Sequence, residues 1–260
     1  MRTVLTIAGS DCSGGAGIQA DIKTITVHKL YAMSVLTALT AQNTTGVFDV
    51  QAVPPAFVGR QMDSVFTDIP PDAVKIGMVY SRGVIEELAR KLREYHATNL
   101  VLDPVLLSTS GRPLLAPDAA EALRRTLMPL AAVITPNLPE AQALCGFSIE
   151  TEAGMERAAA QLAEQTGAAV LVKGGHLAVG TAADCLYDRG KLTWFRAERT
   201  DNPNTHGTGC TLSSAIACHL AGGRTLTESV ERAKAYLSGA LRAGLDLGRG
   251  AGPLDHAYRL

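Results

Sequence analysis

The sequence lacks a surplus of charge of either sign, and this excludes several kinds of partner. Lysine and arginine together number 24, against 25 aspartates and glutamates. Binding of nucleic acid or of an anionic membrane usually leaves a basic surplus. No apolar run approaches the roughly 20 residues that a membrane helix needs, and the run that ends at Ser10 is too short for a signal peptide. We expect no nucleic acid and no membrane as partners, and a small neutral or locally anionic ligand instead.

Cysteine is scarce and shows no disulfide or metal spacing. The cysteines are Cys12, Cys145, Cys185, Cys210 and Cys218. They are odd in number and include no C-x-x-C pair, and a chain of 260 residues that is 47% hydrophobic buries a core without disulfide support. We expect reduced thiols, a cytoplasmic protein and a single domain over residues 1–260.

Strand-like and helix-like segments alternate along the chain. Residues 3–9 form a β-rich run that ends in glycine, and residues 16–30 follow with apolar positions near helical spacing. The unit recurs, and two long helices are expected from about Thr208 and Thr225. Residues 182–198 predict a hairpin that turns at Arg189–Gly190. The alternation predicts an α/β fold whose mainly parallel sheet is covered on both faces and binds ligands at the carboxyl ends of its strands.

The stretch "THGTGC" (residues 205–210) opens one of these long helices. Gly207 and Gly209 let backbone N–H groups approach an anion without side-chain crowding, and a helix N-terminus favours the charge of a phosphoryl group in flight. The alternative is an ordinary helix cap with flexible glycines. Cys210, which ends the motif, is a candidate base if the helix N-terminus favours its thiolate, and otherwise a small buried hydrophobe.

A second motif, "TPNLPEA" (residues 135–141), follows a predicted strand. Asn137 and Glu140 offer oxygen ligands at a spacing that suits a hydrated Mg²⁺ ion. The same two residues also suit a capping box, with Asn137 as N-cap and Glu140 completing it. Spacing alone slightly favours the capping box.

Several weaker signals accompany these motifs. Gln42, Asp103 and Lys173 each follow an apolar run, where an α/β sheet presents its site. The glycines of "AGSDCSGGAG" do not fall in the G-x-G-x-x-G register, which disfavours an NAD site. His206 lies four residues before Cys210, but no other cysteine or histidine lies nearby at metal-ligand spacing, so a satisfied or solvated histidine is favoured over zinc or a thiol–imidazole pair.

Together, "AGSDCSGGAGIQADIKT", "ALTAQNTTGV", "KIGM", "LDPVLLSTSG", "TPNLPEA", "KGGH" and "NTHGTGCTLSSAIA" resemble the bacterial hydroxymethylpyrimidine/phosphomethylpyrimidine kinases of thiamine biosynthesis. The resemblance runs from about Thr3 to the last helix, with the motifs in family order. It implies a ribokinase-like three-layer α/β/α sandwich, ATP and Mg²⁺ as cofactors, and a homodimer. It also implies two successive phosphorylations, of the 5-hydroxymethyl group of the aminopyrimidine and then of the monophosphate.

The resemblance further implies a role for each matching residue. Gln42 corresponds to the position that hydrogen-bonds the aminopyrimidine, and the same pocket is lined by Gly9, Asp21, Met78 and Val105. Asn137, Lys173 and Thr208 correspond to contacts with the nucleotide, and Glu140 and Asp103 to the surroundings of the metal. Cys210 occupies the position of the catalytic base, next to Gly207 and Gly209.

Two positions depart from the family pattern, and two other functions stay open. Cys12 stands where proline or serine is commoner, and Thr109 stands where some relatives carry a lysine that would help to bind a substrate phosphate. The nearest alternative is a pyridoxal or pyridoxine kinase with the same cysteine. A non-catalytic nucleotide-binding regulator on the same fold is a third possibility, disfavoured by the intact motifs.

Overall fold

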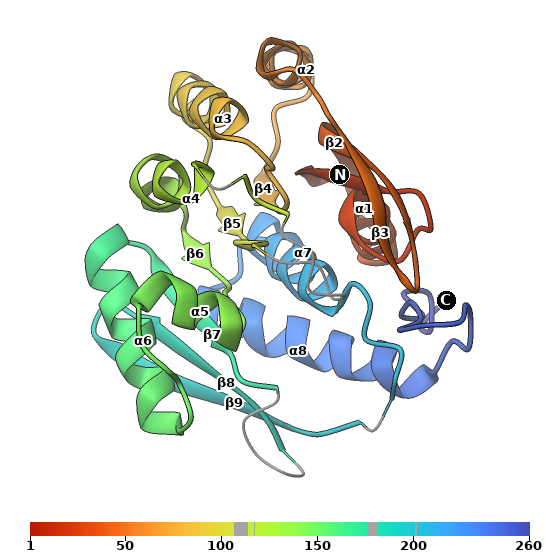
Figure 1. The fold of residues 1–260 in the computed structure, drawn as a ribbon, viewed down its shortest axis with the longest axis vertical. Coiled ribbons are helices and arrows are strands. Elements are labelled where there is room, and N and C mark those ends of the chain that lie inside the picture. The colour runs from red at the N-terminus through yellow and green to blue at the C-terminus, as the bar shows by residue number, and fades with distance from the viewer. Residues whose placement is uncertain (107–113, 117, 176–180, 201) are drawn as a thin grey trace.

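The computed structural model describes residues 1–106, 114–116, 118–175, 181–200 and 202–260. These residues form one nine-stranded sheet in the order β3-β2-β1-β4-β5-β6-β7-β8-β9 (Figure 1). The strands are β1 (Thr3–Asp11), β2 (Tyr31–Asn43), β3 (Gly46–Ala52), β4 (Ala73–Ile76), β5 (Leu100–Leu102), β6 (Val133–Ile134), β7 (Ala169–Lys173), β8 (Thr181–Asp188) and β9 (Lys191–Glu198). The six strands from β2 to β7 in this order are parallel, and β3, β8 and β9 are antiparallel to their neighbours. The mainly parallel sheet is thus confirmed.

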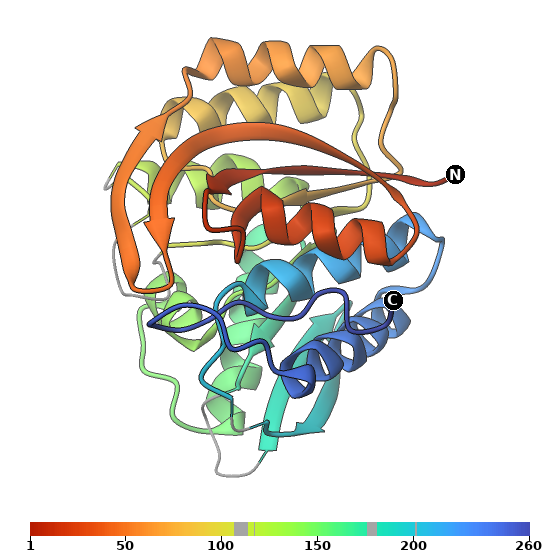
Figure 2. The same ribbon diagram turned by 90° about the vertical axis from the view of Figure 1, so that its right-hand side faces the viewer.

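Helices cover both faces of this sheet (Figures 1 and 2). They are α1 (Gly17–Val27), α2 (Pro55–Phe66), α3 (Arg82–Glu94), α4 (Ala119–Ala122), α5 (Leu138–Cys145), α6 (Glu152–Thr166), α7 (Thr208–Ala221) and α8 (Leu226–Ala243). Helices α1, α7 and α8 share one apolar cluster, which lies on the face that carries Val133 of β6. The next residue, Ile134, packs with α2, α3 and α4 on the opposite face, and its register partner Val170 packs there with α5 and α6. The result is the three-layer α/β/α sandwich that the resemblance implies.

Local sequence explains most boundaries of these elements. Helix α8 begins with the capping box of Thr225 and Glu228, and the β8–β9 hairpin turns at Arg189 and Gly190, both with positive φ. Residues 119–130 do not form one regular α-helix: a single α-turn (Ala119–Ala122) is followed by a π-helical turn (Leu123–Leu127) and a 3₁₀ turn (Met128–Leu130). Pro129 has no N–H to continue the α-helical bonding, so the segment tightens there.

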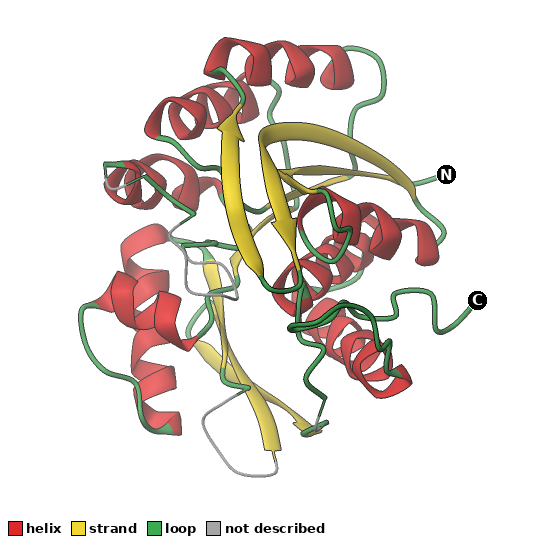
Figure 3. Ribbon diagram, turned by 45° about the vertical axis from the view of Figure 1, so that its right-hand side comes forward, coloured by secondary structure: helices red, strands yellow, loops and turns green. Residues whose placement is uncertain are grey.

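The parallel strands end at one edge of the sheet, where α1 and α7 begin. The tip of the β2–β3 hairpin reaches the same edge, and the C-terminal segment lies beside it (Figures 2 and 3). The backbone amides of Arg249 and Gly250 donate to the Thr44 hydroxyl at 3.1 and 3.2 Å, which fastens the segment to the hairpin. Within the described part of the chain, no helix is long and apolar enough to cross a membrane.

Candidate active site

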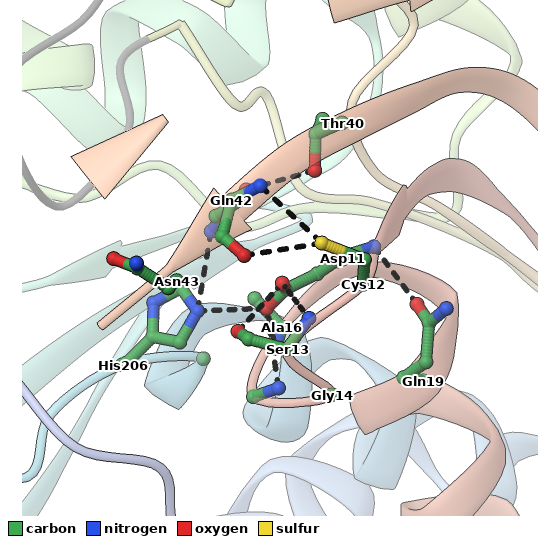
Figure 4. Close-up of polar contacts among 12 residues, drawn as sticks. Asp11, Cys12, Ser13, Gly14, Ala16, Gln19, Thr40, Gln42, Asn43 and His206 are labelled. Carbon is green, nitrogen blue, oxygen red and sulfur yellow. Dashed lines mark hydrogen bonds and ion pairs between the residues drawn. The ribbon is translucent and has the colours of Figure 1, made fainter. Parts of the chain in front are cut away.

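The glycine-rich loop after β1 is wrapped around a carboxylate of its own (Figure 4). Asp11 Oδ2 accepts from the amides of Gly15 and Ala16 at 3.1 and 2.8 Å, and Oδ1 accepts from the amide and hydroxyl of Ser13 at 2.9 and 2.7 Å. Burial alone would raise the pKa of Asp11, but hydrogen bonds from His206, Ser13 and Ala16 outweigh it and hold this pKa well below its usual range. Loop amides that resemble a phosphate cradle are therefore already bound to an anion.

His206 connects this loop to Gln42 (Figure 4). Its Nε2 lies 2.8 Å from Asp11 Oδ2 and 3.2 Å from the side-chain nitrogen of Gln42. Because the carboxylate is ionised, Nε2 carries a proton and donates a hydrogen bond to Asp11 Oδ2. The interpretation of His206 as a satisfied histidine is confirmed. Sequence reasoning missed its partner Asp11, although an aspartate followed by small loop residues is the pattern that captures nearby backbone amides.

Gln42 lines a cavity of about 360 Å³ between the tip of the β2–β3 hairpin and the C-terminal segment. Its wall includes Val47, His206 and Arg249. A cavity of this size suits a small ring compound. Cys12, one of the two departures from the family pattern, contacts the backbone of Gln42, with its sulfur 3.1 Å from the carbonyl oxygen and 3.3 Å from the amide nitrogen. Thr109, the other departure, lies outside the described residues.

Three of the four residues expected around Gln42 lie together. A Cβ on Gly9 would lie 3.0 Å from the sulfur of Met78, and Met78 packs in one apolar cluster with Val105 and with Val47 of the cavity wall. Asp21 differs, because its side chain is fully buried and accepts from Thr6, Lys75 and Ser214. Asp21 thus lies inside the protein in a network of its own, and its place in the acceptor pocket stays a prediction.

The first turn of α7 lies where the sequence predicts an anion cradle, and no side chain caps it. Gly207 adopts a φ of 85°, and a Cβ there would clash with the carbonyl oxygen of Gly15, so only glycine fits. The first bond within the helix runs from the amide of Thr211 to the carbonyl of Gly207, at 2.9 Å. The amides of Gly209 and Cys210 come before Thr211 in the chain, so neither has a carbonyl of α7 to donate to. They are available to a phosphoryl group.

Cys210 lies half-buried at this helix start, and the amide of Gly17 donates to its sulfur. Burial raises the pKa of the thiol to about 11, and the opposing positive charge of Lys75 does not cancel this effect. The expectation that the helix N-terminus favours a thiolate is therefore wrong for this site. Cys210 is a neutral thiol at physiological pH.

A charged cluster adjoins the cradle. Lys173 Nζ lies 2.8 Å from Asp103 Oδ1, and a Cβ on Gly209 would lie 3.1 Å from Asp103 Oδ2 and 3.2 Å from Lys173 Nζ. Asn137 and Glu140 form the capping box, with the amide of Asn137 donating to Glu140 at 2.8 Å and the amide of Glu140 donating to Asn137 at 2.9 Å. The capping alternative is thus confirmed, and it leaves Glu140 beside this cluster.

The carboxylates of this cluster fit a hydrated divalent cation. Burial raises the pKa of Glu140 to about 7, Lys173 opposes this shift and Asp103 adds to it, so a cation placed here would favour the ionised form. Within the described ranges no three histidine, cysteine or acidic side chains gather closely enough to cage a metal. Mg²⁺ needs no such cage, since it keeps several waters and commonly shares one or two carboxylates with substrate phosphates.

Comparison with known proteins identifies the family. The sequence pattern of the phosphomethylpyrimidine kinase family matches residues 11–255. The chain is 50% identical to the hydroxymethylpyrimidine/phosphomethylpyrimidine kinase of Rhizobium meliloti, over 98% of this chain and 97% of that protein. It is also 50% identical to the thiamine biosynthesis bifunctional protein ThiED of Geobacter sulfurreducens, but there 98% of this chain spans only 52% of the relative.

Solved structures agree with this result. The phosphomethylpyrimidine kinase of Clostridium difficile superimposes with a TM-score of 0.82 at 45% identity, over 92% of this chain and 98% of that chain. An ADP complex of Bacillus subtilis pyridoxal kinase superimposes with a TM-score of 0.91 at 36% identity, over 99% of this chain and 98% of that chain. The fold is therefore the ribokinase-like sandwich shared by these vitamin kinases, and the chain belongs to the phosphomethylpyrimidine kinase family.

Proposed function

We propose that this protein phosphorylates 4-amino-5-hydroxymethyl-2-methylpyrimidine with ATP and then phosphorylates the resulting monophosphate to the diphosphate. The observation that carries the proposal is the loop of residues 205–210. His206 of this loop contacts Gln42 at the cavity, and Cys210, four residues later, contributes its amide to the anion cradle. One loop thus joins the end of the site that would hold the aminopyrimidine to the end where phosphoryl transfer would occur. Family membership supports the same substrate.

The neutral thiol of Cys210 suits both acceptors. An alcohol must lose a proton, whereas a phosphate monoester, with a second pKa near 6, is already largely ionised at pH 7. A fixed carboxylate at this position would repel the second acceptor, and a thiol with a pKa of about 11 does not. Because phosphoryl transfer passes through a loose transition state, positioning and charge stabilisation by Gly207, Gly209 and the helix start carry most of the catalysis. We therefore assign Cys210 the role of a neutral group beside the attacking oxygen.

The nucleotide would lie over the charged cluster. We assign the phosphates of ATP to Lys173, Asn137 and Thr208, and Mg²⁺ to Asp103 and Glu140. These residues meet at the carboxyl edge of the sheet, beside the cradle. When bound, Mg²⁺ would neutralise the negative charge that develops on the phosphates during transfer. In this arrangement Lys173 exchanges its bond to Asp103 for contacts with phosphate as the nucleotide binds.

Pyridoxal phosphorylation is the second candidate. The backbone matches the Bacillus subtilis pyridoxal kinase at a TM-score of 0.91, while sequence identity is higher to the pyrimidine kinases. Gln42 favours the pyrimidine, because an amide pairs with both a ring nitrogen and its neighbouring amino group, and pyridoxal lacks this pair.

We also propose a cytoplasmic homodimer of single-domain subunits. All five cysteines are unpaired, as expected in a reducing compartment. The edge strand β3 exposes 63% of Phe48, and Leu39 of the adjoining strand is 48% exposed, so this edge offers apolar surface to a second copy. Light scattering after size exclusion tests the dimer, and replacement of Phe48 by serine should weaken it. A monomeric wild-type protein would reject it.

The test of the proposed function is ADP release with Mg-ATP and three separate acceptors at matched concentrations: the hydroxymethylpyrimidine, its monophosphate and pyridoxal. Turnover of both pyrimidines well above pyridoxal supports the proposal. A preference for pyridoxal, or no turnover of the monophosphate, would assign the chain to vitamin B6 phosphorylation. No turnover with any acceptor would favour a nucleotide-binding regulator.

A further inference from the structure

A fully buried ion pair lies between strand β4 and helix α1. Lys75 Nζ on β4 lies 2.9 and 2.8 Å from the two oxygens of Asp21 on α1, and both side chains are 0% exposed. The same carboxylate accepts from the Thr6 hydroxyl on β1 at 2.5 Å and from the Ser214 hydroxyl on α7 at 2.7 Å. We call Thr6, Asp21, Lys75 and Ser214 the Asp21 cluster. One carboxylate thus connects two strands and two helices.

The Asp21 cluster lies one helical turn from Cys210 on both helices. Ser214 follows Cys210 by four residues on α7, and Asp21 follows Gly17 by four residues on α1. Residues four apart share a helix face. The bond between Ser214 and Asp21 therefore lies one turn behind the contact in which the Gly17 amide donates to the sulfur of Cys210. The two helix starts are fastened together at two successive levels.

Stability alone does not account for such a pair. Desolvating two charges is expensive, and well-packed apolar residues of the same volume often serve a core equally well. The ion pair faces α7, the helix that carries Cys210, and the charges of Lys75 and Asp21 both act on the Cys210 thiol. Asp103 and Lys173 also lie close enough to interact with this thiol. Gly77 leaves room for the ammonium, since a Cβ there would lie 2.8 Å from Lys75 Nζ.

We propose that the Asp21 cluster is a positioning device for phosphoryl transfer. Asp21 holds the first turns of α1 and α7 together through Ser214, so that Cys210 and the cradle amides keep their place. Asp21 partly offsets the charge of Lys75, but Lys75 acts more strongly on the Cys210 thiol, so the pair presents positive charge to the oxygen that loses its proton there. The proposal rests on the proposed kinase function for its substrates, and its geometry is independent of which acceptor is used.

The sharpest test compares two single hydroxyl deletions on the same carboxylate. Ser214→Ala removes the bond to α7, and Thr6→Val removes the bond to β1, so both should lower Tm to a similar extent. Only Ser214→Ala detaches α7, the helix that carries Cys210, from Asp21. We expect its kcat with the hydroxymethylpyrimidine to fall about fivefold or more below that of Thr6→Val, with the KM for ATP unchanged, as the loss of one hydrogen bond to a charged group predicts. Equal kcat values in the two variants would overturn the proposal.

A second readout does not depend on turnover. Peptide-resolved mass spectrometry follows alkylation of Cys210 by iodoacetamide, separately from the exposed Cys12. Release of α7 from Asp21 should expose the thiol and speed its alkylation about fivefold in Ser214→Ala but not in Thr6→Val. Identical alkylation rates in the two variants would contradict the proposal that Asp21 holds α7 in place through Ser214. If the wild type turns over no acceptor, the proposed function fails while this comparison still tests the cluster.

The contribution of charge is tested by removing the whole pair. Lys75→Met with Asp21→Asn should reduce kcat on the order of tenfold or more, because transition-state charge loses its fixed partner. The matched control removes the ion pair of Lys91 and Asp63, which joins α3 to α2 away from the site and should leave kcat unchanged. Unchanged kcat in a folded Lys75–Asp21 double variant would refute the role of Lys75. Should that variant not fold, the Ser214 and Thr6 comparison still decides the proposal.

Discussion

Replacing Cys210 by aspartate should separate the two phosphorylations. The thiol, with a pKa of about 11, carries no charge at pH 8, whereas a carboxylate there adds one negative charge beside those of Asp21 and Asp103. Two unit charges 4 Å apart interact by about 1 kcal/mol in water and about 4 kcal/mol at an effective dielectric constant of 20. The monophosphate carries a charge of about −1.5 to −2, and the alcohol carries none.

A penalty on the order of 2–4 kcal/mol lowers kcat/KM for the monophosphate by a factor of about 30 to 10³. Phosphorylation of the uncharged hydroxymethylpyrimidine does not incur this penalty, and the new carboxylate can accept the proton of its hydroxyl group. The assay is ADP release at pH 8, where an aspartate at position 210 is ionised, with each pyrimidine varied in turn. The control is Cys210→Ser, which is neutral and close in size, and which should affect both steps alike.

The deciding quantity is the ratio of kcat/KM for the hydroxymethylpyrimidine to kcat/KM for its monophosphate. If Cys210→Asp slows both acceptors by the same factor, or slows the alcohol more, then charge at position 210 does not discriminate between the nucleophiles. The reason for a thiol in place of an aspartate would then be packing.

Three further predictions concern other parts of the site. Glu140 has a pKa of about 7, so protonation of its carboxylate competes with binding of Mg²⁺ as the pH falls. The KM for Mg-ATP should therefore rise from pH 8 to pH 6 in the wild type, and this pH dependence should flatten in Glu140→Gln. Gln42→Leu should raise the KM for the hydroxymethylpyrimidine about tenfold or more in steady-state assays, with the KM for ATP unchanged; equal changes in both would place Gln42 outside the acceptor pocket. Gly207→Ala should lower thermal stability more than Gly146→Ala, because both residues have positive φ but only Gly207 lies against another backbone, and calorimetry would compare them.

Much of the fold could be predicted because its signals are local. The periodicity of α3, the capping box of α8 and the turn at Arg189–Gly190 each depend on residues close together in the sequence. Strand β3 escaped prediction, since residues 46–52 alternate only weakly between apolar and polar and lie at a sheet edge, where six of the seven residues are at least partly exposed. Its place is set by pairing with β2, which is a tertiary effect.

The site was predicted in outline, and the exceptions have electrostatic causes. Motif spacing pointed to the cradle, strand-end positions pointed to Gln42, Asp103 and Lys173, and the roles of these residues came from the family resemblance. It did not reveal His206 as a partner of Asp11, because the two residues lie nearly 200 positions apart, although the contacts of Asp11 with its own loop are local. It also misjudged Cys210: the helix N-terminus was visible in the sequence, whereas the burial that raises the pKa of the thiol is not.

The contact between His206 and Gln42 constrains how acceptor preference can change. A substitution at position 42 alters a residue that His206 touches, and His206 belongs to the loop that ends in Cys210. Mutations that adapt the pocket to a new ring will therefore be epistatic with the loop, and their effects on kcat will not add. In a directed-evolution experiment, libraries that vary positions 42 and 206 together should reach new acceptors that neither position reaches alone.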